Sequence, residues 1–81
     1  MGEVRKPGYT GASVWYNEVP SGAVDGHNKA FTVSRLPTGA FFLTQNGLWL
    51  TAGLDYSRDG VHLTVATTPL PGDQLAAVYT A

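Results

Sequence analysis

The stretch that decides the fold is residues 41–50, FFLTQNGLWL, in which Asn46-Gly47 separates two apolar runs. The two central residues of a tight type I′ hairpin turn both need positive φ, which Asn and Gly tolerate best. Side chains in the first run alternate between two faces, as they do along a strand. The stretch therefore predicts two antiparallel strands, Ala40–Gln45 and Leu48–Thr51, joined by this turn.

Short runs rich in Val, Thr and aromatic residues continue on both sides of this hairpin, each bounded by turn residues. The further expected strands are Ser13–Val19, Ala30–Leu36, Val61–Ala66 and Gln74–Thr80. Residues 53–60, GLDYSRDG, are interpreted as a turn. Because no segment has a helical period, the sequence predicts an all-β fold. We expect a small antiparallel β-sandwich or flattened barrel of about six to seven strands.

The alternation within each run predicts which side chains fill the core. The expected core residues are Val14, Tyr16, Phe41, Leu43, Val61, Leu63, Val65, Leu75, Ala77 and Tyr79. The same alternation turns Trp15, Phe42 and Trp49 to the outside.

The chain of 81 residues fits one domain, small enough to bury only about 60 % of its surface on folding. Residues 13–81 form the expected single module, and residues 1–12, with Gly, Pro and no periodicity, an extended N-terminal arm. Without cysteine, the fold has neither disulfides nor a thiolate zinc site to stabilise it. We therefore expect stabilising contacts with other chains, which the arm can provide.

Charge and hydropathy exclude two classes of partner. The net charge is −1 and the five basic residues are scattered, so nucleic-acid binding is not expected. No apolar run approaches the roughly 20 residues of a membrane span. We expect no membrane association.

The Asp25–Asn28 loop, Asp-Gly-His-Asn, offers oxygens and an imidazole within four residues. A hard cation requires about six oxygens, however, and an EF-hand pattern is absent. The loop is therefore interpreted as a structural turn, in which Gly22 and Gly26 supply unusual φ and the Asp and Asn side chains bond the backbone. No metal or cofactor is expected.

Catalysis is also not expected. The only imidazoles are His27 and His62, there is no thiol, and Ser21 lies in Pro-Ser-Gly rather than in a nucleophile elbow. Asp55 and Asp59 lie on expected turns, where carboxylates commonly cap the backbone. A chain this short also has little room for a buried pocket.

The outward aromatic residues are the candidate partner-binding residues: Tyr9, Trp15, Phe42 and Trp49. Aromatic side chains are enriched at the hot spots of protein interfaces. Two other interpretations of Trp15, Phe42 and Trp49 remain open, a second core layer and a platform on which sugar rings stack.

Several elements occur together in the order of a known module. They are Asn17-Glu18, Pro20-Ser21-Gly22, Asp25-Gly26, Asn28, Phe31-Thr32-Val33, Asn46-Gly47-Leu48, Gly53, Asp55-Tyr56, Pro71-Gly72-Asp73 and Tyr79. Over residues 17–80 the chain resembles a small β-sandwich module of tailed-bacteriophage virion proteins, found in tail, neck, fibre and head-surface proteins.

This resemblance implies a non-enzymatic structural accessory protein that decorates, cements or connects capsid or tail subunits. Its partners would be other virion proteins and further copies of itself. Its location would be the virion, assembled in the host bacterial cytoplasm. The alternative is a carbohydrate- or receptor-binding module on the virion surface, with a surface glycan as its ligand.

Overall fold

The computed structural model describes residues 14–81, which contain seven strands and no helix. The strands are β1 (Trp15–Glu18), β2 (Ala30–Thr32), β3 (Phe41–Gln45), β4 (Leu48–Trp49), β5 (Tyr56–Asp59), β6 (His62–Val65) and β7 (Leu75–Thr80). All their pairings are antiparallel, which confirms the predicted all-β fold. Within this part of the chain no helix could cross a membrane.

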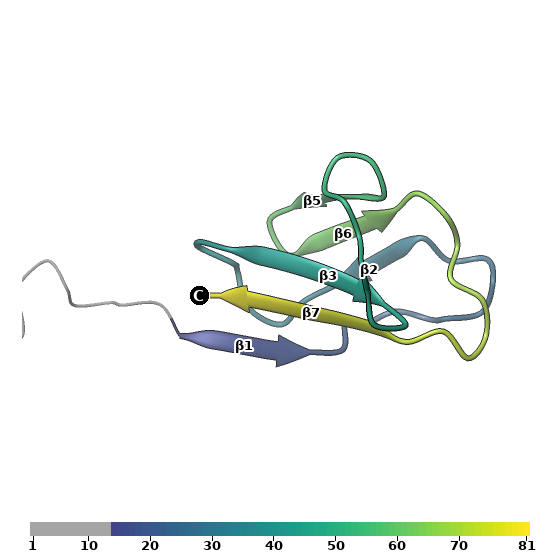
Figure 1. Cartoon of the computed structure of the whole chain (residues 1–81), viewed down its shortest axis with the longest axis horizontal. Coiled ribbons are helices and arrows are strands. Elements are labelled where there is room, and N and C mark those ends of the chain that lie inside the picture. The colour runs from purple at the N-terminus through teal and green to yellow at the C-terminus, as the bar shows by residue number, and fades with distance from the viewer. Residues whose placement is uncertain (1–13) are drawn as a thin grey trace, which may run out of the picture.

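The strands form two sheets that pack face to face. The first has the strand order β1-β7-β3-β4 and the second β2-β6-β5. In Figure 1 the first sheet lies in front, with β7 between β1 and β3, and the second lies behind and above it. Short bridges join the sheets at both sides, Ser21 to Thr32 and Ala52 to Tyr56, so the sandwich approaches a flattened barrel.

The hairpin forms where Asn46-Gly47 predicts it. Asn46 has φ 54° and Gly47 has φ 82°, and Gln45 pairs with Leu48 across the turn. β4 is shorter than expected and ends at Trp49. Its continuation is stopped because the Thr51 N–H donates to the Asp55 carboxylate at 2.7 Å instead of to a strand.

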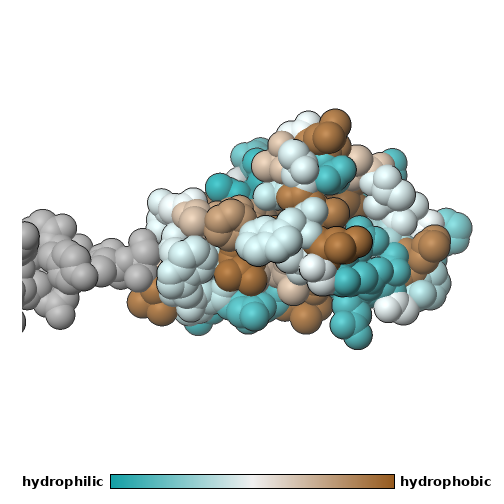
Figure 2. Space-filling view, in the orientation of Figure 1, coloured by the Kyte–Doolittle hydropathy of each residue, from teal (hydrophilic) through white to brown (hydrophobic). Residues whose placement is uncertain are grey.

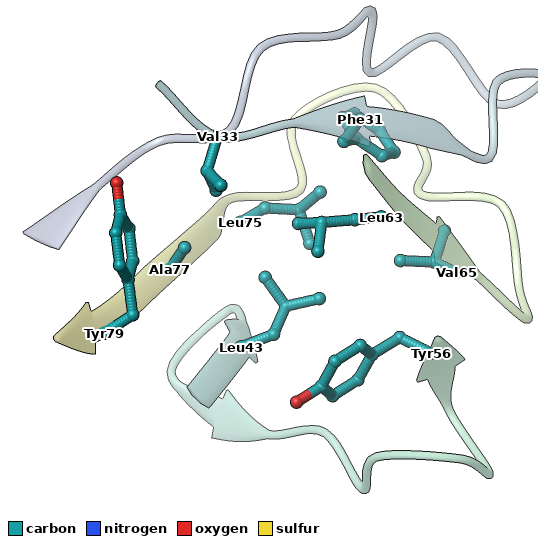
Figure 3. Packing of buried hydrophobic residues seen from close by; sticks show 9 residues of the cluster. All are labelled: Phe31, Val33, Leu43, Tyr56, Leu63, Val65, Leu75, Ala77 and Tyr79. Carbon is teal, nitrogen blue, oxygen red and sulfur yellow. The ribbon is translucent and has the colours of Figure 1, made fainter. Parts of the chain in front are cut away.

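The inner faces of the two sheets meet in one apolar core (Figure 3). Its buried members are Phe31, Val33, Leu43, Tyr56, Leu63, Val65, Leu75, Ala77 and Tyr79. The predicted inward alternation of β6 and β7 is confirmed. Phe41, Tyr16 and Val61 are only partly buried against this core.

The prediction that Val14 belongs to the core is wrong, because its side chain is 55 % exposed. Val14 precedes β1 and exchanges backbone hydrogen bonds with the terminal Ala81. The last buried core residue of β7 is Tyr79. Val14 therefore lies beyond the region that the second sheet covers.

Two other expectations need correction. Residues 53–60 are not a single turn, because Tyr56–Asp59 forms strand β5 against β6. Asp59 accordingly lies at the end of a strand. β2 ends at Thr32, short of the expected Leu36, and the Ser34 N–H donates to the Glu18 carboxylate at 3.1 Å rather than to a neighbouring strand.

Candidate functional site

Three aromatic side chains stand on the outer face of the four-stranded sheet. Trp15 is 58 % exposed, Phe42 38 % and Trp49 65 %. Pairing places them on one face: Trp15 lies opposite Thr80, Phe42 opposite Val78, and Trp49 opposite Thr44. We call Trp15, Phe42 and Trp49 the aromatic ridge.

In the aromatic ridge, the Phe42 ring pairs with each of the two indole rings. The Trp15 and Phe42 rings are nearly parallel, at 10°, with centroids 6.4 Å apart. Phe42 meets Trp49 edge to face, at 80° and 4.9 Å. The two indole planes are therefore close to perpendicular, and Phe42 is the ring that links them. Both geometries are favourable for aromatic pairs.

The rest of this face is uncharged. Glu18 is the one charged residue in the four strands of this sheet, and it pairs with Ala77, whose side chain belongs to the core face. The side chains that alternate outward are Trp15, Asn17, Phe42, Thr44, Trp49, Ala76, Val78 and Thr80. Figure 2 shows brown and near-white residues over much of this side of the molecule. Such a surface suits burial against another apolar surface.

A hollow of about 540 Å³ opens at one end of the same face. Val19, Val24, Thr44, Gly47 and Ala76 are among its lining residues. We call it the end hollow. Its size lies within the range of pockets that accept a small ligand or a partner's side chain.

The register of β1 explains the end hollow. Glu18 pairs with Ala77, so two more residues of pairing would place Pro20 opposite Leu75. Proline has no N–H to donate, and the buried Pro20 is followed by Ser21, which bridges to Thr32 in the other sheet. β1 thus leaves β7 two residues early, and the start of β7 has no neighbour on that side.

Glu18 performs a structural task between the sheets. Its carboxylate accepts hydrogen bonds from the Tyr79 hydroxyl and from the Ser34 hydroxyl, the latter at 2.8 Å. Desolvation pushes the pKa of Glu18 upward, but the hydrogen bonds from Tyr79 and Ser34, together with the nearby Arg35, outweigh it. The pKa of Glu18 is therefore below its ordinary value. Burial raises the pKa of Tyr79, and its bond to Glu18 adds to that effect.

The Asp25 carboxylate forms hydrogen bonds within its own loop. The Asp25 Oδ1 atom accepts from the N–H groups of His27 and Asn28, at 2.9 and 3.0 Å. The bond from His27 is the main reason that the pKa of Asp25 lies below its ordinary value. Gly22 and Gly26 have the expected positive φ, 150° and 84°. Within residues 14–81, no three His, Asp or Glu residues gather as a metal site would require.

The other carboxylates of the turns are also occupied by hydrogen bonding. Asp55 accepts from Thr51, and Asp73 accepts from the Leu70 N–H at 2.8 Å. Asp73 also accepts from the side chains of Gln45 and Asn46, both at 3.0 Å. The bond from Asn46 is the largest cause that lowers the pKa of Asp73. These carboxylates fix loops.

Of the four candidate partner-binding residues, three come together in the aromatic ridge, and Tyr9 lies outside the described residues, as does the expected arm. Sequence reasoning missed the end hollow and the Glu18 contacts. The signal for the hollow was Pro20, directly after a strand, although locating the gap requires the register of β1 on β7.

A scan against family models, a search of curated proteins and a search of solved structures each found no match to this chain.

Proposed function

We propose that this chain is a non-enzymatic structural accessory protein of a tailed-phage virion. It decorates, cements or connects capsid or tail subunits, and it binds protein through the outer face of the four-stranded sheet. The resemblance of residues 17–80 to the virion module supports the phage setting. The aromatic ridge supports the binding mode.

The aromatic ridge is the observation that carries the proposal. Two tryptophans and a phenylalanine are exposed on an uncharged sheet face, although burying an aromatic side chain is favourable by roughly 1.5–3 kcal/mol. Tryptophan is also among the residue types most enriched at interface hot spots. A partner surface that covers this face recovers that free energy.

Ring geometry favours a protein partner over a glycan. A sugar platform offers open ring faces lying in a common plane. Here Trp15 and Phe42 stack on each other, and Trp49 stands nearly perpendicular to both. An extended glycan cannot lie flat on both indoles, whereas interdigitating protein side chains can fill the space between crossed rings.

The proposal assigns the chain no catalytic role, and the positions of its polar side chains support this. Glu18, Asp25, Asp55 and Asp73 each hold backbone N–H groups. The imidazole of His62 lies on the exposed side of β6. These groups stabilise loops and strands.

Mass spectrometry of gradient-purified virions from the source phage tests the proposal. We expect the chain in many copies per particle. Added Trp15→Ala/Trp49→Ala protein should fail to attach to particles stripped of the chain, whereas the control Leu54→Ala/Leu70→Ala, which removes equally exposed apolar groups elsewhere, should attach normally. Absence from purified particles would refute the proposal.

Two further comparisons separate the parts of the proposal. Deleting residues 1–12 should weaken attachment if the arm takes part. A glycan array probed with the intact chain should give no signal, and selective glycan binding that Trp15→Ala abolishes would favour the carbohydrate-binding alternative.

A further inference from the structure

Trp15, one end of the aromatic ridge, and the end hollow lie toward opposite ends of β7. Trp15 pairs with Thr80, the last residue of β7, while the hollow is lined by Leu75 and Ala76, the first two. Four to five residues of strand separate them, or about 15 Å. Along β1 and β7, the outer face therefore carries the Trp15 side chain at one end and a recess at the other.

A two-fold axis lying in the plane of this face, perpendicular to β7, exchanges the two ends. Under that operation the Trp15 side of one copy comes over the end hollow of a second copy, and the reverse contact forms at the same time. β1 lies over β1 of the other copy, because the axis leaves the order of the strands unchanged. A two-fold interface of this kind requires a surface that is complementary to itself.

We propose that the occupant of the outer face is a second copy of this chain, packed two-fold with each Trp15 in the other copy's end hollow. This inference rests on the proposed function, since it names the partner of the same face.

The charge distribution is compatible with a second copy. Like charges placed opposite each other destabilise an interface, and any charge on this face would meet its own duplicate near the axis. None of the outward side chains on the four strands is charged. Asp73 at the rim of the end hollow already accepts hydrogen bonds from Gln45, Asn46 and Leu70.

The size of the face indicates a weak dimer. The strands β1, β7, β3 and β4, with four, six, five and two residues, give about 270 Å² per copy and about 540 Å² in total. This is below the roughly 1,200–2,000 Å² of stable complexes, so we expect a dissociation constant on the order of 10–100 μM. Dimers would therefore form at high local concentration, such as on a particle that holds many copies.

Sedimentation equilibrium of the intact chain from about 10 μM to 1 mM tests the proposal, and dimers should appear across this range. Trp15→Ala, on the ridge, and Ala76→Glu, in the hollow, should each weaken dimerisation at least tenfold. Leu54→Ala, at an equally exposed site on the β4–β5 turn, should leave it unchanged. Thermal melts confirm that each variant folds.

Cross-linking tests the orientation, and the cysteine-free chain leaves the introduced thiol as the only one. Asn17 lies opposite Val78, near the middle of β7 and close to the proposed axis. Since that axis places β1 over β1, Asn17→Cys should join two copies rapidly through a short bis-maleimide. An axis along the strands would instead place β1 over β4, with the two Asn17 positions about three strand spacings, or about 14 Å, apart across the sheet.

The variant Thr44→Cys provides the opposite readout. Thr44 lies on β3, opposite Ala76 near the start of β7, so the proposed axis separates its two copies by about three residues along the strand, or about 10 Å. An axis along the strands would bring those copies within about one strand spacing, about 5 Å. Faster cross-linking of Asn17→Cys supports the proposed packing, and faster cross-linking of Thr44→Cys would overturn it.

A monomer at 1 mM, or a dimer unaffected by both Trp15→Ala and Ala76→Glu, would overturn the proposal. If the chain stays monomeric but Trp15→Ala still prevents attachment to virions, the proposed function stands and this inference fails. If the chain forms a dimer through this face but is absent from purified virions, this inference stands and the proposed function fails.

Discussion

The Tyr79 hydroxyl, at the end of a fully buried side chain, donates a hydrogen bond to the Glu18 carboxylate on the neighbouring strand. The same carboxylate accepts from the backbone and hydroxyl of Ser34, which follows β2 in the other sheet. The Glu18 side chain thus links strands β1 and β7 of the first sheet to the segment that follows β2 of the second sheet.

Removing the hydroxyl in Tyr79→Phe should destabilise the fold. A hydrogen bond to a charged group contributes roughly 1.5–3 kcal/mol, a large share of the stability of so small a domain. Urea unfolding measures the loss. Tyr16→Phe, whose hydroxyl makes none of the described hydrogen bonds, is the matched control, and equal stability of the two variants would contradict this role for Tyr79.

Acid should weaken the fold through Glu18. Because the folded-state pKa is lower than the ordinary 4.5, the contribution of Glu18 is complete above that value and is lost as pH falls through the folded pKa. Asp25 and Asp73, whose pKa values are also lowered, act in the same direction. The urea midpoint of the wild-type chain should therefore change little between pH 7 and pH 5 and should fall between pH 5 and pH 3.

In Glu18→Gln the drop between pH 5 and pH 3 should be smaller, from a lower starting stability. Asp59→Asn removes a carboxylate that makes none of the described hydrogen bonds, and it should keep the wild-type pH profile. An unchanged profile in Glu18→Gln would show that the other carboxylates account for the acid effect.

Gly47→Ala should cost about 1–2 kcal/mol, because Gly47 has φ 82° and a Cβ there is strained although no atom lies within 4 Å of it. Gly47→Asn should recover part of that loss, since asparagine tolerates positive φ. Thermal unfolding measures both. If both variants are equally destabilised, the cause is not backbone conformation.

The aromatic ridge predicts energetic coupling between Trp15 and Phe42. A double-mutant cycle to alanine, measured by unfolding at low micromolar concentration, should give about 0.5–1.5 kcal/mol for the stacked pair. The same cycle for Trp15 and Leu54, which lies on the β4–β5 turn, should be additive. Additivity in both cycles would mean that the two rings do not stack in solution.

Local patterns predicted much of this fold. Asn46-Gly47 indicates its turn through the positive φ that both residues tolerate, and the alternation of Leu75, Ala77 and Tyr79 reveals the core face of β7. β5 was missed because its one buried residue is Tyr56, and the strand exists through pairing with β6.

The candidate site could be predicted in part. Alternation turned Trp15 and Phe42 outward, and the structure shows them on one face with Trp49. Their mutual stacking and the end hollow depend on which strands are neighbours. The hydrogen bonds of Glu18 to Ser34, 16 positions along the chain, and to Tyr79, 61 positions along, depend on the same information. Composition and periodicity do not contain that information.

The change of sheet that the chain makes at Pro20 also affects which segment unfolds first. The segment from Trp15 to Ser21 borders β7 in one sheet and then β2 in the other. If it peels away, the first sheet loses its border strand β1 and β2 of the second sheet loses its bridge to Ser21, and both expose unpaired backbone groups that a strand from another molecule can join. Strand exchange and aggregation on heating should therefore begin here, before the remaining sandwich melts.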